Sequence, residues 1–285
     1  MAMRFAAAAR WSLHRAPRLP VTYGYVGFVA ALSITLSAID PAAAAAFVER
    51  ASTNLNNLAD GHFGTLIGSA FVTGGGSSDW ILIPLLAGLL AAAERLGGGK
   101  RLIKVFAAGH VGATLLVALG LLIAVESGWM SVAVASAPDV GVSYGSAAVL
   151  GAMTALLPIR WRTTWAFSML AAATGGAVVG HTFTSIGHLV ALCIGLAIAP
   201  HLPAPQTALT APKARMSLRL GAGVCVGAVF GLGIFGGDVE PSWFVPTIAV
   251  CAAAVAITAT RYPPLPPLPL LRGMRAPATT PFRVR

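Results

Sequence analysis

The sequence predicts an all-α fold, a polytopic bundle of transmembrane helices. Two observations carry this prediction. The chain of 285 residues is 56% hydrophobic and only 10% charged, whereas soluble domains contain about 25% charged residues. Its apolar residues are also grouped into runs close to the roughly twenty residues that a helix needs to cross a bilayer. Because lipid offers no partner to unpaired backbone groups, such runs are expected to be helical.

Eight segments fit this description, counting short ones that would end in a water-filled hollow. They are residues 21–39, 80–93, 102–125, 143–157, 164–180, 186–199, 218–236 and 243–260. The flanking parts are a basic N-terminus (1–20) and a proline-rich basic tail (261–285). The N-terminal stretch also has the order of a cleaved signal peptide, a basic region followed by an apolar run and PAAAAA. The tail is expected to be extended, either disordered or a ligand for an aromatic groove.

The charges predict the orientation of these segments. Eight of the nine acidic residues lie in alternate loops together with one base, Arg50, while the basic residues gather at the two ends and in the remaining loops. Positive charge marks the cytoplasmic side, so both termini are expected in the cytoplasm. The net charge of +10 is therefore a topology signal and does not indicate nucleic acid. Many Ala and Arg residues with few Lys suggest a bacterial plasma membrane.

A serine lies in a glycine frame at the start of the fourth segment, Gly141-Val142-Ser143-Tyr144-Gly145. GxSxG is also the nucleophile elbow of α/β-hydrolases, which requires a preceding strand and a triad in the order Ser, acid, His. No histidine follows the last acids, Asp238 and Glu240, so that interpretation fails.

A histidine, His188, opens the sixth segment, which runs in the same direction as the fourth and so places His188 at the depth of Ser143. Each segment carries a small-residue stripe at helical spacing, and such stripes allow helix backbones to approach closely. The stripes are Ser143, Ala147 and Gly151 on the fourth segment and His188, Ala191 and Gly195 on the sixth. Close approach is what a Ser–His hydrogen bond would require.

These motifs resemble the rhomboid family of intramembrane serine proteases. That family has a six-helix core, a GxSx serine opening the fourth span, and a histidine opening the sixth before a GxxxG-like pattern, here Ala191-x-x-x-Gly195. GTLIGSAFVTGGG resembles the end of the family's first external loop, and ERLGGGKRL the turn between its second and third spans. The resemblance implies a rhomboid-like six-helix core over residues 21–200, followed by two additional spans within 201–260.

By this resemblance Ser143 would be the nucleophile and His188 the base, cutting a peptide bond at the unwound top of a transmembrane substrate. The family's usual His-x-x-x-Asn oxyanion donors are missing from SSDWILIPLLAG, and losing one such donor typically costs about 10²–10³ in rate. Candidate oxyanion or near-site residues are Gly141, Tyr144, Ser77 and His181. The departures leave two alternatives, a divergent protease and an inactive protein that binds transmembrane helices without cleavage.

The remaining histidines bear on two other classes of function, a metal site and a transporter. A metal site from His181, His188 and His110 would lack further ligands, so no metal and no cofactor is expected. A small transporter usually keeps ionisable residues at mid-membrane, and His110 is the one candidate. The expected partners are membrane lipid and a transmembrane protein substrate or client, with no nucleic acid.

Overall fold

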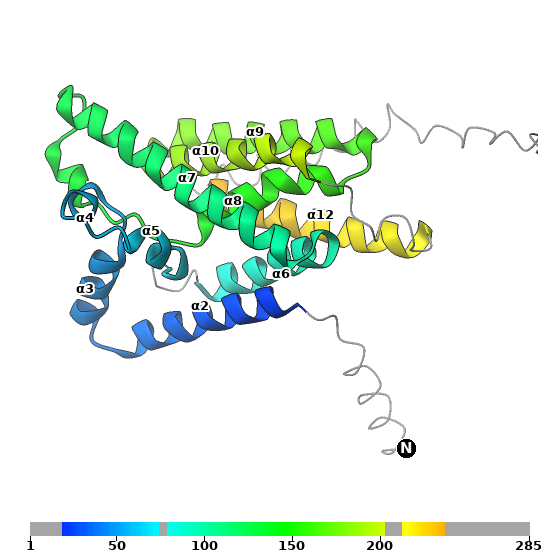
Figure 1. The fold of residues 1–285 in the computed structure, drawn as a ribbon, viewed down its shortest axis with the longest axis horizontal. Helices are drawn as coiled ribbons and strands as arrows, with labels where there is room; N and C mark the ends of the chain where they lie inside the picture. Colours follow the sequence, from blue (N-terminus) through cyan, green and yellow to red (C-terminus); the bar gives the residue numbers. More distant parts are fainter. Residues whose placement is uncertain (1–18, 74–78, 203–212, 237–285) are drawn as a thin grey trace, which may run out of the picture.

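The computed structural model describes residues 19–73, 79–202 and 213–236, and its regular elements within these ranges are all helices (Figure 1). Four of them are long and apolar enough to cross a membrane: Pro20–Ala38, Asp79–Gly97, Gly99–Glu126 and Phe183–His201. The protein is therefore a multi-pass helical membrane protein. The eighth predicted segment, 243–260, lies outside the described residues, as do the tail and almost all of the basic N-terminus.

Each of the first seven predicted segments overlaps one helix or helix pair. These helices are α2 (Pro20–Ala38), α6 (Asp79–Gly97), α7 (Gly99–Glu126), α8 (Ser143–Ala152) continued by η3 (Met153–Leu156), α9 (Ile159–Gly180), α10 (Phe183–Ile198) and α12 (Lys213–Gly236). Shorter elements lie in the connections: α3 (Pro41–Ala51), α4 (Leu55–Ala59), α5 (Thr65–Gly68), η1 (Ser69–Phe71), η2 (Val132–Ser136) and η4 (Ala199–His201).

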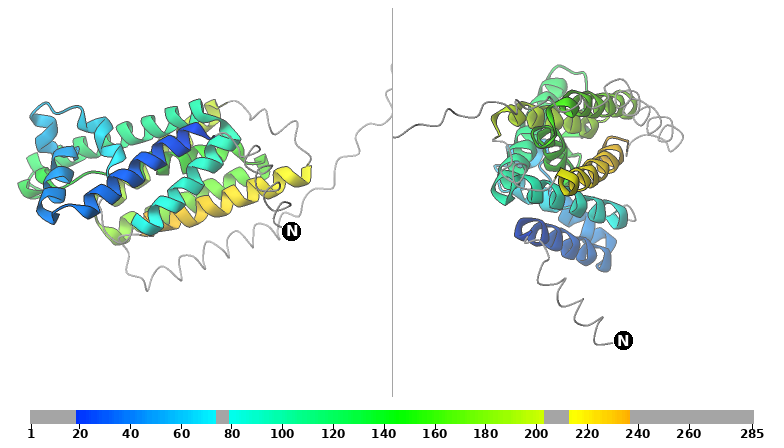
Figure 2. Two further views of the ribbon diagram at one scale, coloured as in Figure 1. Left: turned by 90° about the horizontal axis from the view of Figure 1, so that it is seen from below. Right: turned by 90° about the vertical axis from the view of Figure 1, so that its right-hand side faces the viewer.

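The short helix α8 is the centre of the bundle. Every residue of α8 after Ser143 is buried, and the helix packs most extensively against α10 and α7. Helix α9 lies beside α10, and α2 lies beside α6 at the other side of the bundle (Figure 1). Helix α12 packs between α6 and α9, as the end-on view shows (Figure 2). The connection α3–α5 gathers at one end of the bundle, which we call the α3–α5 end.

Glycines allow α8 to approach its two main neighbours at backbone distance. A Cβ atom at Gly195 of α10 would overlap the carbonyl oxygen of Ala148, and one at Gly109 of α7 would overlap the Ala148 side chain. At Gly151 it would lie 2.5 Å from the Leu192 carbonyl oxygen of α10. Without side chains at these positions the three backbones come close enough for van der Waals packing, which is the main attraction between helices in lipid.

Local capping explains several helix starts. Asp40 accepts hydrogen bonds from the amides of Ala42 and Ala43, with Pro41 at the first helical position of α3. The start of α2 is capped from a distance, because Glu94 of α6 accepts hydrogen bonds from the amide and hydroxyl of Thr22 at 2.8 and 2.7 Å. An anion at a helix N-terminus complements the helix dipole, so this buried carboxylate fastens α2 to α6.

Candidate active site

The first turn of α8 presents backbone donors at the α3–α5 end. Gly141 has φ +135°, a conformation that favours glycine, and its amide donates to the Ser69 carbonyl at 3.0 Å. Ser143 is the first residue of α8, and no side chain caps the helix at Val142. The first amides of a helix lack intrahelical acceptors and carry the positive end of its dipole. The Ser143 hydroxyl, half-buried, therefore lies where developing negative charge is stabilised.

His188 lies in the second turn of α10 and is only 7% exposed. Thr182 caps this helix by accepting a hydrogen bond from the Ser185 amide at 3.1 Å. The imidazole ring is packed between two aromatic rings in edge-on geometry, Tyr144 at 5.5 Å and Phe235 of α12 at 6.2 Å between centroids. Buried ionisable groups in membrane helices are costly and often functional.

The contact between the ends of α8 and α10 is made by Tyr144, the residue after Ser143. A Cβ at Gly187 would overlap the Tyr144 ring and hydroxyl, so glycine at 187 provides the space in which the tyrosine sits against His188. The structure thus brings Ser143, Tyr144 and His188 to one end of the bundle. Ala147, Gly151, Ala191 and Gly195 lie in the α8–α10 contact below them, where Ala147 and Ala191 are fully buried.

A buried polar cluster joins the connection after α3 to the loop before α8. Ser69 Oγ is 3.1 Å from His110 Nε2, and Thr53 donates its hydroxyl to Ser69 Oγ at 2.9 Å. The amide of Thr53 donates to the Asp139 carbonyl at 3.0 Å, and the amide of Asp139 donates to Ser52 Oγ at 2.6 Å. His110 therefore serves to hold η1 against α7, and with it the Gly141 turn that begins the site.

Asp139 connects this cluster to the site. Burial raises the pKa of its carboxyl from 3.8 to about 6, and a side-chain hydrogen bond with Tyr144 offsets part of that rise. Near neutral pH the carboxylate therefore accepts from the same tyrosine that contacts His188. The loop before α8 and the imidazole are linked through one side chain.

The raised pKa of Asp139 predicts a pH-dependent stability. A carboxyl whose pKa is higher in the folded state gives stability that is complete below its unfolded pKa of 3.8 and lost as the pH rises through its folded pKa of about 6. The midpoint of thermal unfolding in detergent is expected to fall across this interval in the wild type, and to fall less in Asp139→Asn. Asp60→Asn is the control, because Asp60 is exposed. Equal pH profiles for Asp139→Asn and the wild type would contradict the assignment.

The structure does not place two of the sequence candidates in this arrangement. His181 is exposed and ends α9 in the left-handed conformation at φ 50°. Ser77 lies outside the described residues. The described first turn of α6 begins with Asp79, which accepts hydrogen bonds from Ser33 at 2.6 Å and Thr73 at 2.5 Å. That carboxylate is therefore held by two hydroxyls. Among the described residues no cluster of three metal-ligating side chains occurs.

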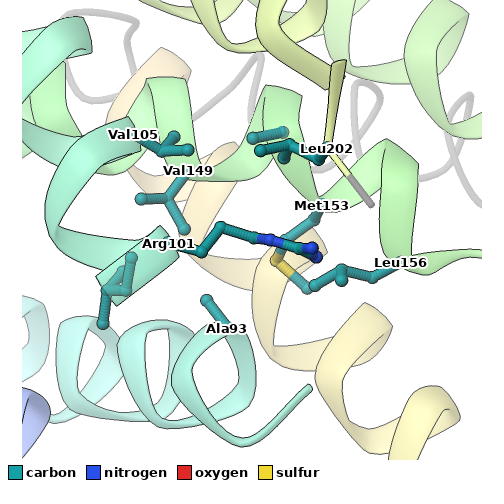
Figure 3. Close-up of a pocket in the computed structure, with 9 residues that line it drawn as sticks. Ala93, Arg101, Val105, Val149, Met153, Leu156 and Leu202 are labelled. Carbon is teal, nitrogen blue, oxygen red and sulfur yellow. The ribbon is translucent and has the colours of Figure 1, made fainter. Parts of the chain in front are cut away.

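A pocket lies at the opposite end of α8 from Ser143. Its lining includes Val149 and Met153 with Arg101 of α7, whose side chain extends along it (Figure 3). The lining residues from α8 and η3 all follow residue 148, so the pocket is separated from the serine by more than one helical turn. It does not form part of the candidate site.

The fold and this site define a class of protein, a multi-pass helical membrane protein. Its buried central helix begins with a serine, at the end of the bundle where a buried histidine also lies. The sequence profile of the family described as "Rhomboid-like protein" matches residues 15–208. The chain belongs to the rhomboid-like protein family, which confirms the resemblance found in the sequence. Neither the curated proteins nor the solved structures include a match to the chain.

Sequence reasoning missed several residues around the site. Ala148, which lies outside the Ser143 stripe, is where Gly109 and Gly195 make their closest approach. No local pattern singles out Asp139 or Ser69, because their partners lie far away along the chain. Phe235 carried no signal, since it is one apolar residue among many in its helix. The sequence offers one hint, the position of Asp139 next to Pro138 in the loop before the GxSx motif.

Proposed function

We propose that this protein is an intramembrane serine protease of the rhomboid type, with Ser143 as nucleophile and His188 as general base. The family to which the chain belongs includes serine proteases. The observation that carries the proposal is local: Ser143 opens a helix whose next residue contacts the buried imidazole of His188 at 5.5 Å between ring centroids. The substrate is a transmembrane helix, and the predicted topology puts the cut near the external face.

The mechanism assigns each group one task. His188 takes the proton of the Ser143 hydroxyl while Oγ attacks the carbonyl carbon of the scissile peptide bond. The resulting oxyanion is stabilised by the Ser143 amide at the start of α8. His188 then returns the proton to the leaving amine, and water hydrolyses the acyl-enzyme with the same base. The hydrogen bond between Ser143 Oγ and His188 is part of this proposal, since hydrogen bonds of catalytic groups tighten in the substrate complex.

A second candidate, binding transmembrane helices without cleavage, is favoured by a different observation. Tyr144 occupies the edge of His188 and is hydrogen-bonded to Asp139, and the described part of the α6 start offers Asp79 and Trp80 where oxyanion donors would be expected. The Asp79 carboxylate, already held by two hydroxyls, does not stabilise the negative charge of an oxyanion. The two candidates differ in whether Ser143 is needed for function.

Cleavage of a transmembrane reporter separates these candidates. The purified protein, reconstituted in lipid vesicles with a fluorescently labelled single-span helix, is expected to release a shorter fragment. Ser143→Ala is expected to abolish the release, because the nucleophile is gone. Ser146→Ala is the matched control, since the Ser146 hydroxyl is buried in the same helix and donates only to the Val142 carbonyl at 2.6 Å. Cleavage that survives in Ser143→Ala, or folded wild-type protein that binds the reporter without cutting it, would contradict the proposed protease function.

A further inference from the structure

Helix α12 lies in a groove whose floor is α8 and whose walls are α6 and α9. The Cβ position of Gly88 on α6 is 3.9 Å from Cβ of Val226. The Cβ position of Gly227 is 3.1 Å from Trp165 of α9 and 3.3 Å from Leu150 of α8. One face of α12 therefore contacts three helices at once, while Cys225 and Val229 on another face are exposed.

The contact of α12 with the floor differs from the contacts that α7 and α10 make with α8. At the glycines of those two contacts, an added Cβ atom would overlap the facing helix. Helices α7 and α10 therefore cannot slide along α8 without loss of packing. Helix α12 meets α8 through the ends of flexible side chains, with Leu150 methyl groups 3.3 Å from the Cβ positions of Gly227 and Gly231. Removing α12 would therefore leave the α7–α8–α10 packing intact.

The end of α12 reaches the candidate site. Phe235, the residue before the last in α12, is buried and its ring contacts His188. Its carbonyl oxygen approaches α9 so closely that a Cβ at Gly176 would overlap it. By the charge-based topology α12 runs toward the external face, so its outer end lies where the outer end of a substrate helix would have to be presented.

We propose that α12 is an internal stand-in for the transmembrane client, because it fills the groove formed by α6, α8 and α9 along which a client helix would approach the site. This inference rests on the proposed function. The client is a single membrane-spanning helix with small residues at every fourth position, matching Gly223, Gly227 and Gly231. It reaches Ser143 and His188 when α12 leaves the groove, so α12 limits access to the site. The population with α12 displaced sets the apparent affinity.

A reversible cross-link between α6 and α12 tests this directly. The pair Gly88→Cys and Val226→Cys suits a disulfide, since the Cβ separation of 3.9 Å lies within the usual ~3.5–4.5 Å, and Val226→Cys removes the methyl group that crowds position 88. The protein is the full chain with Ser143→Ala and its three native cysteines replaced by alanine. The probe is a dye-labelled synthetic peptide with the sequence of residues 213–236, and its association in lipid vesicles is measured by energy transfer.

Oxidation is expected to weaken association by about tenfold or more, and reductant to restore it. Two controls are the Gly88→Cys single variant under the same oxidant and the same peptide carrying Gly223→Leu, Gly227→Leu and Gly231→Leu. In the absence of a cross-link, Gly176→Ala is expected to strengthen association by about threefold or more, because its Cβ displaces Phe235. Gly175→Ala is the matched control, since nothing lies within 4 Å of its Cβ position.

The outcomes separate the stand-in role of α12 from the protease function. Association that is equal in the oxidised and reduced protein, or equal for Gly176→Ala and Gly175→Ala, overturns the stand-in role whatever the catalytic result. If association responds to the cross-link but the wild type does not cleave the reporter, the protease function is overturned and a client-binding groove remains.

Discussion

Replacing His188 by glutamine is expected to lower reporter cleavage by about 10²–10⁴-fold, the usual contribution of a general base. Glutamine keeps a polar side chain of similar size between Tyr144 and Phe235, so α10 should stay packed while the base is lost. The rate is measured with the reconstituted protein and the labelled helix, alongside thermal unfolding in detergent to verify that the variant is folded.

Two other histidines provide the comparison for this result. His181→Ala should cleave at the wild-type rate, because His181 is exposed at the end of α9. His110→Ala should lower stability, because the Ser69 hydroxyl keeps its contact with Thr53 but loses its partner His110 at 3.1 Å. A folded His188→Gln protein that cleaves within a factor of about three of the wild type would show that another group removes the serine proton.

The second large effect is expected at Gly195, where α10 meets α8. The Cβ of Gly195→Ala would overlap the carbonyl oxygen of Ala148, and a backbone atom cannot turn aside as a side chain does. Overpacking of this kind costs about 1–3 kcal/mol, and separating the helices also moves His188 away from Ser143. We expect a lower unfolding midpoint and loss of cleavage in the same variant.

Gly175→Ala is the matched control, since it makes the same change on α9 with no atom within 4 Å of the new Cβ. Measuring both variants by intrinsic tryptophan fluorescence during heating gives the comparison. An unfolding midpoint for Gly195→Ala equal to that of Gly175→Ala would show that the close approach of α8 and α10 is not required for folding.

Hydropathy was sufficient to locate α2, α6, α7, α8, α9, α10 and α12, because length and apolarity are what a bilayer demands of a spanning segment. It did not indicate the short helices α3, α4 and α5. The start of α8 at Ser143 followed from a local signal, the glycine frame around the serine. The small-residue spacing pointed to the contact between α8 and α10, while the atom of closest approach, at Ala148, depends on the rotation of both helices. That rotation is set by tertiary packing and does not appear in the spacing.

The surroundings of the site could not be predicted, because they depend on contacts between distant parts of the chain. The connection between α2 and α6 must fold back over α7 and the loop before α8 before Thr53, Ser69, His110 and Asp139 can meet. Phe235 reaches His188 only because α12 packs between α6 and α9. Polar residues in loops and apolar residues in helices have many equivalent partners in a sequence, so the pairing is decided by the fold.

Mapping a fluorophosphonate adduct shows directly whether Ser143 is an activated nucleophile. The purified protein is treated with the probe in detergent, digested, and analysed by mass spectrometry. With Ser143 as nucleophile and His188 as base, we expect one adduct on the peptide containing Ser143, lost in Ser143→Ala and strongly reduced in His188→Gln. Folded wild-type protein with no adduct at Ser143, or an adduct that persists unchanged in His188→Gln, would contradict it.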